Sequence, residues 1–212
     1  MSERQNPTLR GSIASDIEGA PSVAFLMEYV PVYRAAFYAC LAEELSQRSI
    51  DFRLCVGDPA PPRAPRNDAV MPPGAVFHKS RFLSIRGRQL KLQFFPKEAR
   101  TADLLVVQQE AGNLVNYLLA IRARFGRAFA VWGHGEDPFE EQRSEFSERL
   151  KGLFTRQAIW AFAYTNRSKQ GFEAHGMASD RITVVNNSMR IETAVEPPVS
   201  YTHLTLPTTP YV

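Results

Sequence analysis

Apolar positions along the chain form short continuous runs that alternate with stretches of helical spacing. Residues 23–27 (VAFLM) form the first run, and residues 50–56 (IDFRLCV) alternate like a second strand. Between them, one set of apolar residues recurs at helical spacing and is expected to form the buried face of a helix: Tyr33, Ala36, Phe37, Cys40, Leu41 and Leu45. The pattern therefore predicts a complete β-α-β unit.

The same alternation continues to residue 185, interrupted by a loop at 58–74 that contains six prolines. Further strands are predicted at 75–78, 103–108, 128–132, 158–164 and 181–185, and helices at 113–125, 144–156 and 167–175. The helix at 113–125 is expected to bury Leu114, Tyr117, Leu118 and Ile121. Strands that alternate with helices indicate the α/β class, here a Rossmann-like open parallel sheet with helices on both faces.

The composition is that of an ordinary globular protein, because 44% of the 212 residues are hydrophobic and the formal net charge is +3. The longest apolar runs are far shorter than the roughly 20 residues that cross a bilayer, and residues 1–20 lack the apolar core of a signal peptide. We therefore expect a cytoplasmic protein with a disordered polar extension at 1–20. Cys40 and Cys55 are too few for a disulfide framework, so both are expected in the core, and no metal is predicted.

Residues 78–100 carry seven basic residues against one acidic residue, Glu98, which is a local net charge of +6. Aromatic and aliphatic residues are interleaved with these charges. Two interpretations follow: residues 79–97 dock on an anionic membrane surface, or they form a solvated basic face that covers the core. Nucleic acid is not an expected partner, because no nucleic-acid-binding motif accompanies the charge.

Ligands of open parallel sheets bind beyond the carboxyl ends of the strands, so the residues after each apolar run are the candidates for chemistry. No glycine-rich dinucleotide fingerprint follows the first strand and no phosphate-binding P-loop occurs, which argues against a dehydrogenase and a P-loop NTPase. The sharpest local feature is Trp132-Gly133-His134-Gly135. A histidine between two glycines exposes its imidazole and lets a ligand approach the backbone, although a turn histidine that caps the next segment is the competing interpretation.

Three other residues near strand ends are weaker candidates. Glu110 and Asn113 follow the predicted strand at 103–108 and are expected to line the acceptor side of a cleft. Arg34 opens the first helix and is expected to meet an anionic group, although a surface arginine needs no ligand to explain it.

Four segments in order resemble the N-terminal domain of family 4 retaining glycosyltransferases, over roughly residues 22–191. They are Tyr33-Arg34, Trp132-Gly133-His134-Gly135, Ala163-Tyr164-Thr165 and residues 181–188 (RITVVNNS). The resemblance implies the first half of a two-domain GT-B fold and transfer of a sugar from a nucleotide-sugar to a glycan or lipid-linked acceptor. It also implies that His134 is catalytic, that substrate is bound by Gly133, Gly135, Arg34, Glu110, Asn113 and Asn187, and that no cofactor is needed besides the donor.

Two departures from that family are visible. The family commonly has Pro-Asn-x-x-Asp near the end of this domain, whereas this chain has Asn186 in place of the proline and Arg190 in place of the acid. The family also uses a Glu-x₇-Glu pair in its second domain. Glu140 and Glu148 have that spacing, but their charged surroundings indicate a solvated helix face with i,i+4 ion pairs.

The domain boundaries expected from these patterns are the extension at 1–20, one domain at 21–191 and the start of an interdomain linker at 192–198. Residues 199–212 contain no charge, and 199–209 resemble the translation of a sequencing adapter, so this tail is expected to be spurious. The natural protein is then expected to continue into a second domain that holds the nucleotide-sugar, and this fragment alone to be inactive. The alternative is a non-catalytic, flavodoxin-like binding or regulatory module.

Overall fold

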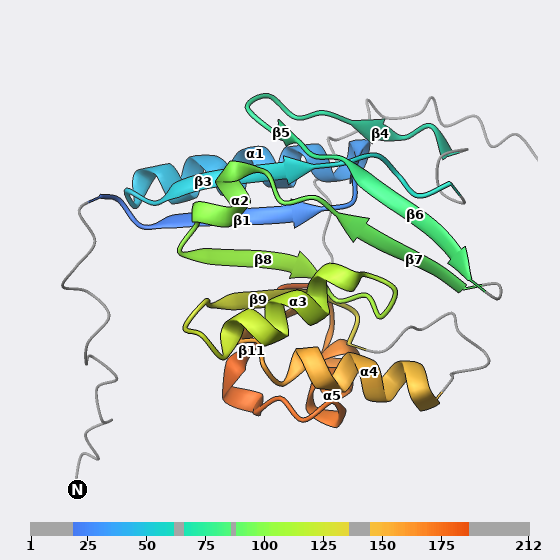
Figure 1. Ribbon diagram of the computed structural model, residues 1–212. Coiled ribbons are helices and arrows are strands. Elements are labelled where there is room, and N and C mark those ends of the chain that lie inside the picture. The colour runs from blue at the N-terminus through green and yellow to red at the C-terminus, as the bar shows by residue number, and fades with distance from the viewer. Residues whose placement is uncertain (1–18, 62–65, 86–87, 136–144, 187–212) are drawn as a thin grey trace, which may run out of the picture.

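The computed structural model describes residues 19–61, 66–85, 88–135 and 145–186 (Figure 1). Asn187, Glu140, most of the expected N-terminal extension, the expected linker at 192–198 and the tail at 199–212 lie outside the described residues. Within the described part of the chain, no helix is long and apolar enough to span a membrane.

A seven-stranded sheet forms the centre of the molecule, and all of its strand pairs are parallel. Its spatial order is β11 (Ile182–Val184), β10 (Trp160–Ala163), β9 (Phe129–Gly133), β8 (Leu104–Gln108), β1 (Ser22–Met27), β3 (Asp51–Val56) and β5 (Val76–Phe77). The chain runs outward from β1 in one direction to β5 and then from β8 in the other direction to β11. The strand order therefore reverses between β1 and β8, which is where open α/β sheets offer a ligand site.

Helices cover both faces of this sheet, as the sequence predicts. On one face α1 (Val32–Gln47) packs through Tyr38 against Phe25 and through Phe37 against Trp132. The other face is covered by α2 (Lys97–Thr101), α3 (Leu114–Ala123), α4 (Glu145–Thr155) and α5 (Asn166–Ala174), followed by the short 3₁₀ helix η2 (Ser179–Arg181). The predicted α/β class with an open parallel sheet is confirmed.

The predicted apolar face of α3 is confirmed for Tyr117, which packs against the core, and is wrong for its other three residues. Leu114, Leu118 and Ile121 are exposed, whereas Val115 and Leu119 are buried against the sheet. Nearly every position of this helix is apolar, so periodicity alone does not identify the buried side. Packing against α4 and the sheet decides which stripe turns inward.

The buried face of α1 is also displaced from the prediction. Tyr33 and Cys40 are exposed, and the helix contacts the core through Phe37, Tyr38 and Leu41. The expectation of a buried Cys40 is therefore wrong, because this residue lies on the solvent side of the helix. Cys55 is buried in β3 as expected, and burial raises the pKa of its thiol to about 12.

The basic stretch folds into an element that was not predicted, an antiparallel ribbon of β6 (Ser80–Ile85) and β7 (Arg88–Gln93). A second small antiparallel pair joins β2 (Val30–Pro31), which precedes α1, to β4 (Ala69–Val70), which lies within the proline-rich loop. The ribbon projects beyond the carboxyl ends of β1, β3 and β8 (Figure 1). It approaches the loop after β8 so closely that a Cβ on Gly112 would lie 2.5 Å from the Gln89 carbonyl oxygen. The glycine therefore lets the ribbon pack there.

Candidate functional site

Three side chains from distant parts of the sequence meet at the carboxyl ends of β9 and β10. The His134 ring, just after β9, lies with its centroid 4.4 Å from that of Tyr164, just after β10. The Arg34 guanidinium carbon, from the first turn of α1, lies 5.0 Å from the centre of the same tyrosine ring. We call this arrangement the Arg34–Tyr164–His134 stack. It brings together two of the predicted site residues and adds a third.

The glycines beside His134 are explained by packing. A Cβ on Gly133 would lie 3.1 Å from the Cβ of Gln109. Gly135 has φ +72°, and a Cβ there would lie 2.3 Å from the backbone oxygen of Ser168 in α5. The two glycines let the end of β9 approach its neighbours and leave His134 exposed on the surface. Their predicted contact with substrate stays a prediction.

Tyr164 is the site residue that the analysis of strand ends did not select. Burial raises the pKa of its phenol, and the Arg34 guanidinium beside it offsets part of that rise, so the group is neutral at physiological pH. The stack thus offers a permanent cation, a neutral phenol and an exposed imidazole. Its position directly after a strand, within Ala163-Tyr164-Thr165, was the available signal.

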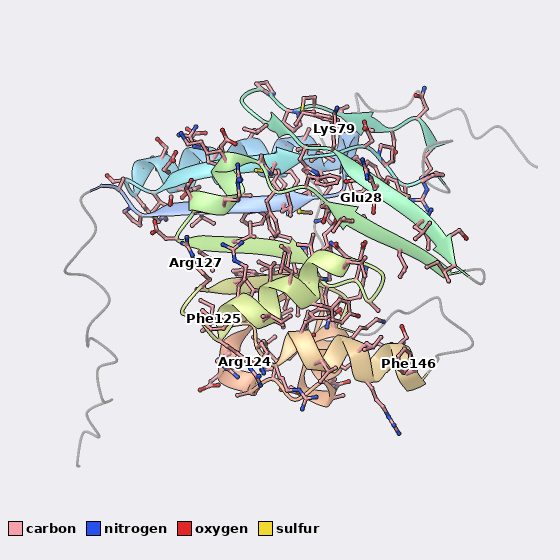
Figure 2. All side chains as sticks on the ribbon, in the orientation of Figure 1. Glu28, Lys79, Arg124, Phe125, Arg127 and Phe146 are labelled. Atoms are coloured by element: carbon pink, nitrogen blue, oxygen red, sulfur yellow. The ribbon has the colours of Figure 1, made fainter. Side chains whose placement is uncertain are left out.

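A second group of polar residues lies at the point where the strand order reverses. Lys91 of β7 places its Nζ 2.6 Å from Glu28 after β1 and 2.5 Å from Glu110 after β8. Glu28 and Lys91 are only 1% and 4% exposed. Glu28 also accepts a hydrogen bond from the Ala60 amide at 2.9 Å. Figure 2 shows Glu28 at the end of β1, beneath the base of the ribbon. We call Glu28, Lys91 and Glu110 the Lys91 cluster.

Asn113 has a structural task in the same region. Its side chain is fully buried, accepts from the Val115 amide to cap α3, and donates to Gln93 Oε1 at 2.6 Å. Its predicted role as a substrate ligand would require it to leave both partners. Glu110, in contrast, is partly exposed beside Lys91 and stays accessible from the edge of the sheet.

Glu148 does not belong to a solvated helix face, and that interpretation is corrected here. Its carboxylate accepts from Lys151 at 2.8 Å and contacts His175 Nε2 at 2.8 Å, with 22% of the side chain exposed. Burial by itself raises the pKa of Glu148, but the Lys151 and His175 contacts outweigh it and lower that pKa overall. The pair therefore ties α4 to the end of α5. The predicted partner Glu140 lies outside the described residues.

A shallow hollow of about 700 Å³ lies at the base of the ribbon, at the carboxyl ends of β3 and β5. It is lined by Asp58, Phe77, His78, Lys79, Ser80, Arg81, Phe94, Phe95 and Pro96. His78 is buried beneath it, with Nε2 2.9 Å from the Met27 carbonyl oxygen. The carboxyl edge thus has three distinct regions: the stack, the Lys91 cluster and this hollow.

No family model matches this chain, and no curated protein matches it. Its fold is similar to that of UDP-GlcNAc 2-epimerase from Methanocaldococcus jannaschii, at 13% identity and a TM-score of 0.45, over 77% of this chain and 45% of that one. It is also similar to Anabaena HepE in complex with UDP, at 15% identity and a TM-score of 0.48, over 79% and 44% of the two chains.

A third similar structure is the lipopolysaccharide outer core galactosyltransferase WaaB, at 14% identity and a TM-score of 0.45, over 86% of this chain and 50% of that one. The chain thus spans about half the length of these solved structures or slightly less. Since all three TM-scores are below 0.5, substrate and activity have to be argued from this chain's own residues.

Proposed function

We propose that this chain is the acceptor-side domain of a glycosyltransferase that moves a sugar from a nucleotide-sugar to a glycan or lipid-linked acceptor. The observation that supports this most directly is the Arg34–Tyr164–His134 stack at the carboxyl edge of a parallel sheet. An aromatic ring suits the apolar face of a sugar, while a cation and an imidazole suit hydroxyl and phosphate oxygens.

In this proposal the three residues act on different parts of the substrates. His134 hydrogen-bonds to the transferring sugar, and Arg34 interacts with negative charge that develops on the leaving diphosphate. Tyr164 holds both side chains and is a positioning residue. Gly133 and Gly135 allow close approach, and Glu110 meets the acceptor. Asn187, which lies outside the described residues, is proposed to contact substrate as well. The retaining family 4 mechanism and a GT-B partner domain are part of the proposal.

The competing function is a non-catalytic, flavodoxin-like binding or regulatory module. The reading frame downstream of codon 198 separates the two. A further α/β domain with a Glu-x₇-Glu pair would support the transferase, and a stop codon there would support the module.

The activity itself is tested with the longest protein that the gene encodes. Transfer from a panel of nucleotide-sugars to extracted glycan and lipid acceptors is measured for the parent, His134→Ala and a matched surface variant, Phe125→Ser. We expect His134→Ala to lower kcat at least about 100-fold, in the range for loss of one polar group that acts on the transition state, and Phe125→Ser to leave it unchanged. Equal turnover of parent and His134→Ala would refute the assigned role.

A further inference from the structure

The β6–β7 ribbon has two chemically different faces. Strand pairing places Arg81 opposite Leu92 and Leu83 opposite Leu90, and the side chains of these pairs share one face with that of Ile85 because side chains alternate along each strand. The other face includes Lys91 and Gln93, which are both buried against the domain. The face that carries Leu83 therefore points away from the sheet.

The outward face is apolar and open to solvent. The exposed fractions are 59% for Leu83, 47% for Ile85, 38% for Leu92 and 45% for Phe94, which follows directly after β7. A single exposed aliphatic residue needs no explanation. Several on one face of one ribbon form a continuous patch, and such patches mark interaction surfaces.

Basic residues border this patch, and the two described strands contain no acidic residue. Lys79 and Arg81 are exposed at the base of the ribbon, and the Arg81 guanidinium carbon lies 5.6 Å from the centre of the Phe94 ring. Lys91 does not contribute, because it is held inside by Glu28 and Glu110. The inner face of the ribbon therefore covers the domain, and the outer face is exposed to solvent.

We infer that the outward face of the ribbon docks on an anionic lipid bilayer. Aliphatic and aromatic side chains enter the boundary between headgroups and acyl chains, while Lys79 and Arg81 meet the anionic headgroups. Because the ribbon projects past the strand ends (Figure 1), docking turns the carboxyl edge of the sheet toward the membrane. The inference does not rest on sugar transfer, since membrane binding is measured without a donor.

The first experiment is cosedimentation of the 212-residue protein with vesicles. One set contains phosphatidylcholine alone and the other contains phosphatidylcholine with phosphatidylglycerol, each at low salt and at about 0.5 M salt, where the Debye length shrinks to roughly 4 Å. We expect binding to the anionic vesicles only, with release at high salt. Equal binding to both vesicle types would overturn the electrostatic part of the inference.

Variants then test whether the ribbon is the surface that binds. The double variant Leu83→Ser/Leu92→Ser is expected to lower partitioning at least about tenfold, since it removes two aliphatic side chains from the interface. Arg81→Gln should lower it about fivefold, which corresponds to about 1 kcal/mol for one basic residue near an anionic surface. Far-UV circular dichroism and the thermal midpoint confirm that each variant is folded.

Phe125→Ser and Arg124→Gln are the matched controls. Phe125 is 81% exposed and, with Arg124, lies at the end of α3 away from the ribbon (Figure 2). Both controls are expected to bind like the parent. The inference fails if they weaken binding as much as the ribbon variants do. It also fails if Leu83→Ser/Leu92→Ser abolishes concentration-dependent self-association and the parent binds no vesicles, because the patch would then be a protein interface.

Discussion

The Lys91 cluster and the Arg34–Tyr164–His134 stack occupy the same edge of the same sheet but differ in almost every physical respect. The cluster lies between β1 and β8 at the base of the ribbon, where the buried Lys91 ammonium holds the carboxylates of buried Glu28 and partly exposed Glu110. The stack lies at the ends of β9 and β10, where an exposed histidine is flanked by two glycines that have no side chains. Position at a strand end therefore does not by itself make a residue available to a ligand.

The difference teaches how this domain uses the point where the strand order reverses. That point is the expected place for a ligand, and here Lys91 fills much of it with an ion pair that attaches the ribbon. The proposed substrate contacts of His134 and Arg34 therefore lie at the neighbouring strand ends. If this comparison is right, variants of buried Glu28 and Lys91 should change mainly the free energy of unfolding, and variants in the stack should change mainly turnover.

The largest expected effect is that of Lys91→Met. It leaves the Glu28 carboxylate buried without its cation, and breaking a buried pair in this way costs about 3–5 kcal/mol of folding free energy. Urea denaturation of the 212-residue protein measures it. The double variant Glu28→Gln/Lys91→Met removes both charges and should recover at least half of the loss. A cost below about 1 kcal/mol for Lys91→Met would show that the cluster is not the joint that holds the ribbon.

The next effect is a contrast between two glycines with similar backbone angles. Gly135 has φ +72° and Gly126 has φ +79°, but a Cβ would meet the Ser168 carbonyl at the first and nothing within 4 Å at the second. Gly126→Ala should cost about 1–2 kcal/mol for the left-handed conformation alone. Gly135→Ala should cost a further 1–3 kcal/mol, roughly, for overpacking against α5. Equal costs in chemical denaturation would mean that α5 shifts freely away from the end of β9.

The order of strands and helices was predictable from the sequence because most elements are short apolar runs separated by turn residues. The buried faces of α1 and α3 were not predictable, because both helices carry apolar residues on more than one side and packing against the sheet determines which side is buried. The ribbon was predictable but was not predicted. Its sequence has two alternating runs separated by a short segment that contains Gly87, which is typical of a hairpin.

The site was predictable only in part, for a related reason. His134 and Arg34 can be recognised from the residues next to them in the sequence. Lys91 and Glu28 are 63 residues apart, and no local sequence pattern predicts that pairing. Because Lys91 lies among other basic residues in the sequence, a solvent-exposed position was expected for it. Tyr164 was not predicted because an aromatic residue after a strand is equally typical of a core, and its proposed role follows from its contacts with His134 and Arg34.

A smaller effect on folding stability is expected when the Glu148 carboxylate is protonated at acid pH. The folded-state pKa of this carboxyl is lowered, so its contacts stabilise the fold fully above the unfolded pKa, near 4.5, and that contribution is lost as the pH falls through the folded pKa. The stability of the parent should therefore fall more steeply below pH about 4.5 than that of Glu148→Gln. Thermal midpoints between neutral and acid pH measure both slopes. Parallel curves would mean that the Lys151 and His175 contacts do not favour the ionised carboxylate.

The smallest expected effect on stability is that of His134→Ala, and it is the sharpest test of the comparison. The histidine side chain is exposed, so its removal should cost less than about 1 kcal/mol. Phe129→Ala, a change at a fully buried residue of β9, the strand that His134 follows, should cost about 3–5 kcal/mol and shows that the denaturation assay is sensitive there. A large loss of stability from His134→Ala would make the residue part of the packing at the end of β9. A lost turnover with intact stability would instead set the stack apart from the Lys91 cluster as the place where substrate is handled.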